Sequence, residues 1–325
     1  MLKTRKETKQ EKKERKEAFI QAIIKNQDFS GSESEIRKLK RIVEEYAESI
    51  GFELTENALF LGTNGKTGLN IVNLSFSSAI HCPECIKGHC RVQKPIRDLK
   101  GLKTGNKQVC YACSINNRHI ETFIKNTWNY ILFHTLTDNE IVKQIKSYIL
   151  TNGALYLRFN EYGSFIDEEC IKRCINISNT LIKEGYIKNS FSYTSNKHLF
   201  NKYNNIDGFV LSYSEGFNFD LNDLEPSIKK TGVVTLSSIT MWKNNPEKAL
   251  KQGREVLIPL LNNPDVVICC GNCSNCPYCK NNNDKRLVLF LRHGNGWNGH
   301  IEDYLTETEY LNYLEALHKD NIQFQ

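Results

Sequence analysis

The chain has 325 residues, 40% of them hydrophobic and 12 of them cysteine, with a formal net charge of +6. A chain of this length can bury a sizeable core without cross-links, so the disulfide framework of a short secreted protein is the minor alternative. Its apolar runs are too short to cross a bilayer, and its first residues lack the apolar stretch of a signal peptide. We expect a soluble protein of a reducing cytoplasm (the host cell cytoplasm if a phage encodes it), without a membrane partner.

The excess positive charge is concentrated at the start of the chain. Residues 1–17 contain eight Lys or Arg and four Glu, and few apolar side chains. Residues 1–30 are therefore expected to form a basic arm or helix, partly disordered, ahead of a single domain over residues 31–325. Such an arm can bind the phosphates of DNA or RNA, but a solvated tail explains the same composition.

Hydrophobic spacing predicts helices and strands along most of the remaining chain. The first half is predicted to contain helices over 34–50, 118–133 and 139–150, and strands over 58–61 and 69–76. The second half is predicted to contain strands over 154–159, 189–194, 208–213, 233–236, 256–260, 266–268 and 287–291, and helices over 167–183 and 306–317. This alternation predicts an α/β fold with a largely parallel sheet and helices outside, either open or curled into an incomplete (β/α) barrel.

A glycine-rich segment joins the first two predicted strands. Residues 62–67, with the sequence Gly-Thr-Asn-Gly-Lys-Thr, resemble the short phosphate loop of the Mur-type amino-acid ligases. A phosphate loop leads into a helix, whose N-terminus helps to bind the anion, but the residues that follow here alternate like a strand. We therefore interpret the segment as a turn between two strands.

The first of two cysteine groups allows two kinds of metal site. Its members are Cys82, Cys85, Cys90, Cys110 and Cys113. Two pairs with two-residue gaps fit a four-thiolate zinc site, which leaves Cys90 unused. The alternative is a 4Fe–4S cluster on three of these thiolates, with one iron open to a substrate or cofactor. The spacing does not decide which three cysteines would be ligands.

The second group has three two-residue gaps in succession. Its members are Cys270, Cys273, Cys276 and Cys279. Iron–sulfur clusters commonly take thiolates at such gaps, so we favour iron–sulfur over zinc here. Cys269 directly precedes the group and is left unassigned. Cys170 and Cys174 lie one turn apart on a predicted helix and are interpreted as buried small hydrophobic residues.

Polar side chains follow the ends of several predicted strands. Because the carboxyl ends of strands face the ligand in α/β folds, these side chains are candidates for function. Arg158 can hold a carboxylate or phosphate and Glu161 can bind an amine or take a proton, so both are candidate catalytic and cofactor-binding residues. Thr194, Ser214 and, in a glycine-rich loop, His293 complete the candidate cofactor pocket. Ordinary turn chemistry explains each of these residues singly.

The order of the motifs resembles the phage gene-product-88 family, proteins of phages and mobile elements without an assigned activity. The matching segments are Asn64-Gly65-Lys66, Cys110-Tyr111-Ala112, Ser192-Tyr193-Thr194, the late cysteine group and His293-Gly294. After Arg158 the chain departs from the family pattern, with Asn160, Tyr162 and Ser164 in place of His, Ser and Asp. An activity that used that His or Asp would be absent or performed differently here.

The layout also resembles, more distantly, the radical S-adenosylmethionine enzymes. These have an early cysteine loop, a partial barrel and often a late auxiliary cluster. Their usual three-cysteine spacing is absent, but Cys82, Cys85 and Cys90 show the gaps of the thiamine-pyrimidine synthase branch. The resemblance implies S-adenosylmethionine bound at an open iron.

Two classes of function follow from the sequence. One is a phage-type iron–sulfur protein, a divergent radical S-adenosylmethionine-like enzyme acting in nucleic-acid metabolism. The other is a zinc-stabilised phage protein without catalysis that binds DNA, RNA or a host protein partner. The sequence leaves open whether the protein is an enzyme.

Overall fold

A computed structural model gives the structure of the chain. It describes residues 7–63, 68–76, 82, 119–161, 163–216, 221, 228–269, 271, 273, 276, 278–281, 283–291 and 297–323. The chain divides into two compact units, which are described separately. The first comprises residues 1–62, 73–151 and 159–184, and the second comprises residues 63–72, 152–158 and 185–325.

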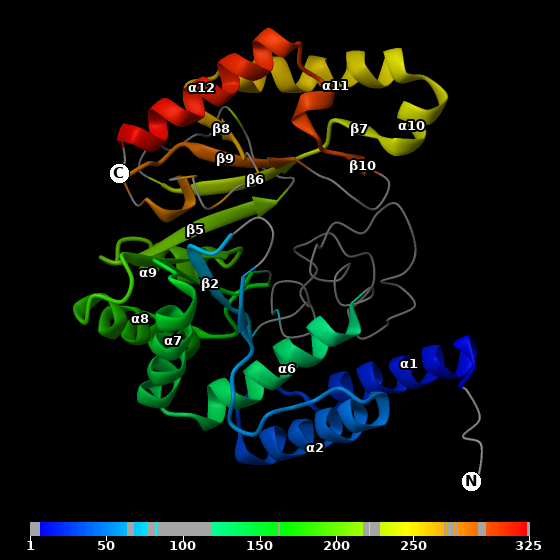
Figure 1. Ribbon diagram of the computed structural model, residues 1–325, viewed down its shortest axis with the longest axis vertical. Helices are drawn as coiled ribbons and strands as arrows, with labels where there is room; N and C mark the ends of the chain where they lie inside the picture. Colours follow the sequence, from blue (N-terminus) through cyan, green and yellow to red (C-terminus); the bar gives the residue numbers. More distant parts are fainter. Residues whose placement is uncertain are drawn as a thin grey trace. The chain divides into compact units, whose positions relative to one another are not determined.

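The architecture is α/β with a mostly parallel, open eight-stranded sheet (Figure 1). Its strands, in spatial order, are β1 (Leu61–Gly62), β2 (Ile71–Leu74), β3 (Tyr156–Phe159), β4 (Asn189–Thr194), β5 (Phe209–Gly216), β6 (Lys230–Val234), β9 (Leu287–Leu291) and β8 (Val266–Ile268). The pair β1–β2 is antiparallel, whereas the pairs from β3 to β6, β6–β9 and β8–β9 are parallel. The α/β prediction is confirmed, and the sheet takes the open form. A short antiparallel pair joins β7 (Ser237–Ser238) to β10 (Trp297–Asn298).

The first unit contains five helices among its described residues. They are α1 (Lys9–Asn26), α2 (Glu33–Ile50), α6 (Ile120–Thr135), α7 (Asp138–Asn152) and α8 (Glu168–Lys183). Residues 9–26, expected within a basic arm, form a helix that begins with a capping box of Thr8 and Glu11. The Phe19 ring stacks on Tyr46 at 4.0 Å and meets Phe123 edge-on at 5.6 Å, so apolar contacts hold α1 against α2 and α6.

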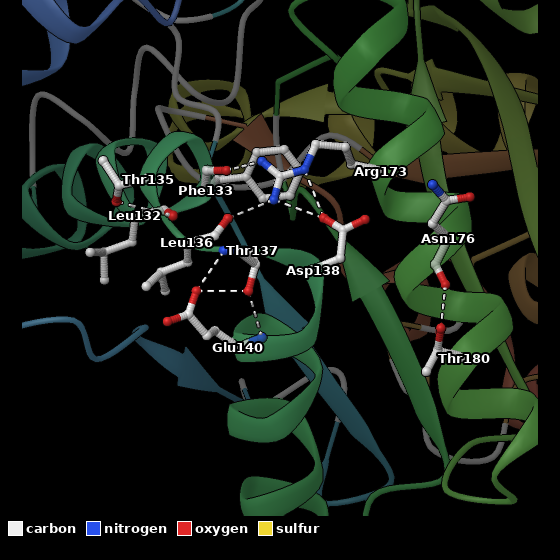
Figure 2. A network of polar contacts seen from close by, with 10 residues as sticks. All are labelled: Leu132, Phe133, Thr135, Leu136, Thr137, Asp138, Glu140, Arg173, Asn176 and Thr180. Carbon is white, nitrogen blue, oxygen red and sulfur yellow. Dashed lines mark hydrogen bonds and ion pairs between the residues drawn. The ribbon is translucent and has the colours of Figure 1, made fainter.

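Arg173 of α8 ties together three helices of the first unit (Figure 2). Its guanidinium donates hydrogen bonds to the Leu136 carbonyl at 2.8 Å, to the Phe133 carbonyl, and to Oδ1 of Asp138 at 2.8 Å. It also lies 4.5 Å from the centre of the Phe133 ring. The last carbonyls of a helix have no partner within it, so Arg173 satisfies the end of α6 and holds the first turn of α7.

Replacing Arg173 with Met should lower the free energy of unfolding by about 1–3 kcal/mol, because buried carbonyls and a carboxylate lose their donor. Urea unfolding of the full chain measures the change. The matched control is Arg37→Met, since Arg37 is exposed and pairs at 3.7 Å with exposed Glu33, a contact that contributes little. Equal stability losses in both variants would contradict the role given to Arg173.

The second unit covers one sheet face with three helices: α10 (Ile239–Asn244), α11 (Pro246–Leu261) and α12 (Glu307–Gln323), on one side of β6, β8 and β9 in Figure 1. Along β9, Leu287, Leu289 and Leu291 belong to the apolar cluster beneath these helices. Val288 belongs to a separate cluster on the opposite face. Strand alternation therefore gives β9 two buried faces. A shorter helix, α9 (Lys197–Tyr203), packs against β4 and β5.

The predicted strand over residues 256–260 is wrong, because these residues belong to α11. The Asn245 side chain caps this helix by accepting a hydrogen bond from the Lys248 amide at 3.0 Å, and Pro246 occupies its first turn. The buried residues of α11 recur at helical spacing: Ala249, Gly253, Leu257 and Leu260. A short apolar run does not distinguish a strand from one face of a helix.

Other predicted elements are confirmed with small shifts. The strands over 189–194, 266–268 and 287–291 have their predicted bounds, while β6 begins at Lys230 rather than at residue 233. Residues 71–74 form a strand that pairs antiparallel with β1, while residues 64–67 of the glycine-rich segment lie outside the described residues. Among the described residues, the structure contains no helix that is both long and apolar enough to span a membrane.

Gly253→Ala should lower the free energy of unfolding by about 1–3 kcal/mol through overpacking. A Cβ at this position would lie 2.0 Å from Cε1 of Tyr304. The Tyr304 ring cannot yield easily, because its hydroxyl is hydrogen-bonded to Ser237 at 2.6 Å and to Trp242 at 3.1 Å. Gly62→Ala serves as the control, since its Cβ would meet nothing within 4 Å. An unchanged urea midpoint for Gly253→Ala would refute this packing.

Candidate metal centre

The described thiols of the second cysteine group lie on one face of the sheet, opposite α10 and α11. This thiol face is defined by Phe191, Val210, Val267 and Val288, which share an apolar cluster with Ile71, Tyr278 and Cys279. Cys269, Cys273 and Cys276 pack against the same cluster. The described residues of the cysteine loop (residues 269–284) therefore lie against this face of β4, β5, β8 and β9.

A short 3₁₀ turn, η3 (Tyr278–Lys280), docks the cysteine loop on β4 and β5. The Asn189 side chain donates a hydrogen bond to the Lys280 carbonyl at 2.6 Å. The guanidinium of Arg286 lies 4.9 Å from the Tyr278 ring centre and pairs with the Asp284 carboxylate at 2.8 Å. The loop is thus held by side chains at its C-terminal end and by a side chain of the sheet.

Lys229, which directly precedes β6, holds the cysteine loop through hydrogen bonds to its backbone. Its side chain is 1% exposed, and its Nζ donates hydrogen bonds to the carbonyls of Asn281 and Asp284, both at 2.7 Å. Burial lowers the pKa of Lys229 to about 8, while the Cys279 thiol and the Asp284 carboxylate act in the opposite direction. A cation this deep in the protein is stabilised by negative charge nearby.

Lys280 places a second cationic side chain against the same sulfurs. Its Nζ donates to the Cys273 carbonyl at 2.9 Å and lies 4.4 Å from the centre of the Tyr156 ring. Burial lowers the pKa of Lys280, and the thiols of Cys276, Cys273 and Cys279 counteract this shift. Two buried ammonium groups beside three sulfurs favour an anionic state of the loop.

Tyr193 links the sulfurs to the sheet. Its side chain interacts with the Cys279 thiol, and burial, followed by the charge of Cys279, raises the Tyr193 pKa well above its ordinary value. The Arg158 guanidinium lies 5.3 Å from the Tyr193 ring centre and 6.0 Å from that of Phe191, and its charge acts to lower the same pKa. Arg158 therefore lies on the thiol face.

The described thiols of the second cysteine group pack against one apolar cluster, but they do not form a coordination site. Cys82, Cys269, Cys273, Cys276 and Cys279 are thiols rather than disulfides. Among the described residues, no three Cys, His, Asp or Glu side chains are grouped so as to hold one metal ion. Several predicted ligands lie outside the described residues: Cys85, Cys90, Cys110, Cys113 and Cys270.

The strand-end residues are divided between the two faces of the sheet. Ser214 alternates with Val210 and so shares the thiol face with Arg158. Thr194 follows Tyr193 and points to the other face, where its Oγ1 accepts a hydrogen bond from the Asn196 amide at 3.1 Å. Arg158 and Thr194 therefore do not share one face.

The other predicted residues lie elsewhere. The Glu161 amide donates to Ser75 Oγ at 2.9 Å in the first compact unit, and its carboxylate has an intermediate exposure. His293 lies outside the described residues. Cys170 and Cys174 are buried in α8, and burial raises the pKa of both thiols, which agrees with their interpretation as small hydrophobic residues.

Sequence analysis missed the two buried lysines. Lys280 directly follows a predicted ligand, which is a usable signal because cations near thiolates stabilise their charge. Lys229 has no such signal, since its partners lie 52 and 55 residues further along the chain.

The chain was compared with protein families, curated proteins and solved structures, and none of them matches it. The site is therefore interpreted from its own chemistry.

Lys229→Met should loosen the cysteine loop, because two carbonyls would lose their buried donor. We expect hydrogen–deuterium exchange of the amides of residues 278–281, in metal-free protein, to become about tenfold faster or more, which corresponds to about 1.4 kcal/mol and does not depend on the thiol pKa. Mass spectrometry of the labelled peptide measures the rate. In the control Lys251→Met, an exposed lysine paired with Glu255 at 4.0 Å is removed, and the rate should not change. Equal rates in the two variants would show that Lys229 does not hold the loop.

Proposed function

We propose that this protein binds a metal–thiolate centre, an iron–sulfur cluster in preference to zinc, through its second cysteine group on the thiol face. The observation that supports this proposal most directly is the position of Cys273, Cys276 and Cys279 beside the buried ammonium groups of Lys229 and Lys280. A centre held by several thiolates is an anion, and it would supply the negative charge that these lysines favour.

The surroundings also suit a protected cluster. The Tyr193 hydroxyl and the backbone of a tight turn lie near the sulfurs, and donors of this kind adjust the reduction potential of iron–sulfur clusters. The apolar side chains beneath the loop limit access of water. Metal binding and the folding of a metal-binding loop are coupled. Metal binding would therefore draw Cys270, Cys273, Cys276 and Cys279 into one coordination shell.

Zinc remains the alternative for this centre, since four thiolates also suit a structural zinc site. The wider hypotheses remain predictions from the sequence: the phage-family resemblance, a radical S-adenosylmethionine-like reaction, and binding of nucleic acid or of a host protein. Their key residues are mainly those of the first cysteine group, of which the structure describes Cys82 alone.

Purification without oxygen, followed by analysis of iron, zinc and acid-labile sulfide, tests the proposal. Cys276→Ser should lose the metal of one centre, about four iron and four sulfide for a 4Fe–4S cluster. The control Cys174→Ser changes a thiol buried in α8 and should keep the wild-type metal content. A wild-type protein without metal, or equal content in both variants, would rule out the second centre.

A further inference from the structure

We infer that the thiol face carries, beside the cysteine loop, a binding site for the carboxylate or phosphate group of a small ligand, formed by Ser212 and Arg158. This inference rests on the proposed function only for the position of the ligand, which would lie next to the metal centre. The donors themselves belong to β3 and β5 and are independent of metal.

Ser212 is the first observation. Its side chain is 1% exposed, and within the described part of the chain its Oγ has no hydrogen-bond partner. Buried hydroxyls are normally satisfied, and leaving one without a partner costs about 1–3 kcal/mol. Ser212 alternates with Val210 and so faces the cysteine loop rather than the helices. A ligand oxygen at this position would accept the bond that the hydroxyl lacks.

Arg158 is the second observation. Its guanidinium lies over the ring of Tyr193 at 5.3 Å, and Tyr193 is the direct neighbour of Ser212 across β4 and β5. Contact with an aromatic ring limits the movement of the guanidinium, whose N–H donors form a planar fork. This fixed fork suits the two oxygens of a carboxylate or phosphate.

The positive charges of Arg158 and Lys229 near Ser212 favour an anionic ligand over a cationic one. Tyr193 and Arg158 lie on the β4 side of Ser212, and Lys229 lies on the other side, where its carbonyl accepts a hydrogen bond from the neighbouring Tyr213 amide at 2.9 Å. A cationic ligand would be repelled from both directions. An oxyanion would be attracted by both charges and would receive the Ser212 hydroxyl bond.

Titration of the oxygen-free, full-length protein with inorganic phosphate and with acetate tests the inference, using calorimetry. We expect one of the two ions to bind saturably. Ser212→Ala should weaken its binding about tenfold, and Arg158→Gln by more than about tenfold, because a charge-assisted bond is lost. The control Ser190→Ala removes a hydroxyl of β4 that bonds to the Gly208 carbonyl at 3.2 Å, on the opposite face, and should bind normally.

Each outcome distinguishes this inference from the proposed function. Phosphate binding without acetate binding indicates a phosphate ligand, and the reverse indicates a carboxylate. Binding of neither ion, or unchanged binding in both variants, overturns the inference. Loss of metal in Ser212→Ala would also overturn it, because the hydroxyl would then belong to the metal centre. Wild-type protein that binds the ion but contains no metal would contradict the proposed function alone.

Discussion

The structure of the second unit depends on two buried ammonium groups, one within a sulfur-rich loop and one beside it. Lys229 and Lys280 donate to backbone carbonyls of that loop, at 2.7 Å and 2.9 Å respectively, and both lie close to its thiols. Burying such cations is unfavourable unless negative charge accompanies them. The loop, its sulfurs and the lysines therefore form one electrostatic unit, and the proposed metal–thiolate centre would supply the negative charge that balances it.

Strand alternation decides which side chains join this unit. The odd and even positions of β4, β5 and β9 point to opposite faces, so one face packs under α10 and α11 while the other holds the cysteine loop. The same alternation places Tyr193, Ser212 and Arg158 with the sulfurs and sends Thr194 away from them. A sheet with both faces buried thus supports a helical core and a polar site at once.

Much of this fold could be predicted from local patterns, because polar and aromatic residues alternate in β4, and β8 and β9 are short, continuous apolar runs of the kind found in buried parallel strands. The run over 256–260 could not, since its apolar residues fit a helix and a strand equally well. Cys273, Cys276 and Cys279 lie against one apolar cluster, and their role as metal ligands stays a prediction from their spacing. The burial of Lys229 depends on carbonyls more than 50 residues away, so no local pattern reports it. The face occupied by Thr194 was predictable from alternation with Tyr193.

The central claim is that sulfur atoms of the second cysteine group bind metal in the folded protein. X-ray absorption at the metal edge, on full-length protein purified without oxygen, measures the ligands directly. A first shell of sulfur at about 2.3 Å is expected for either metal, with an additional iron–iron distance if the centre is a cluster. A shell of nitrogen and oxygen alone, or the absence of a metal signal, would contradict the account.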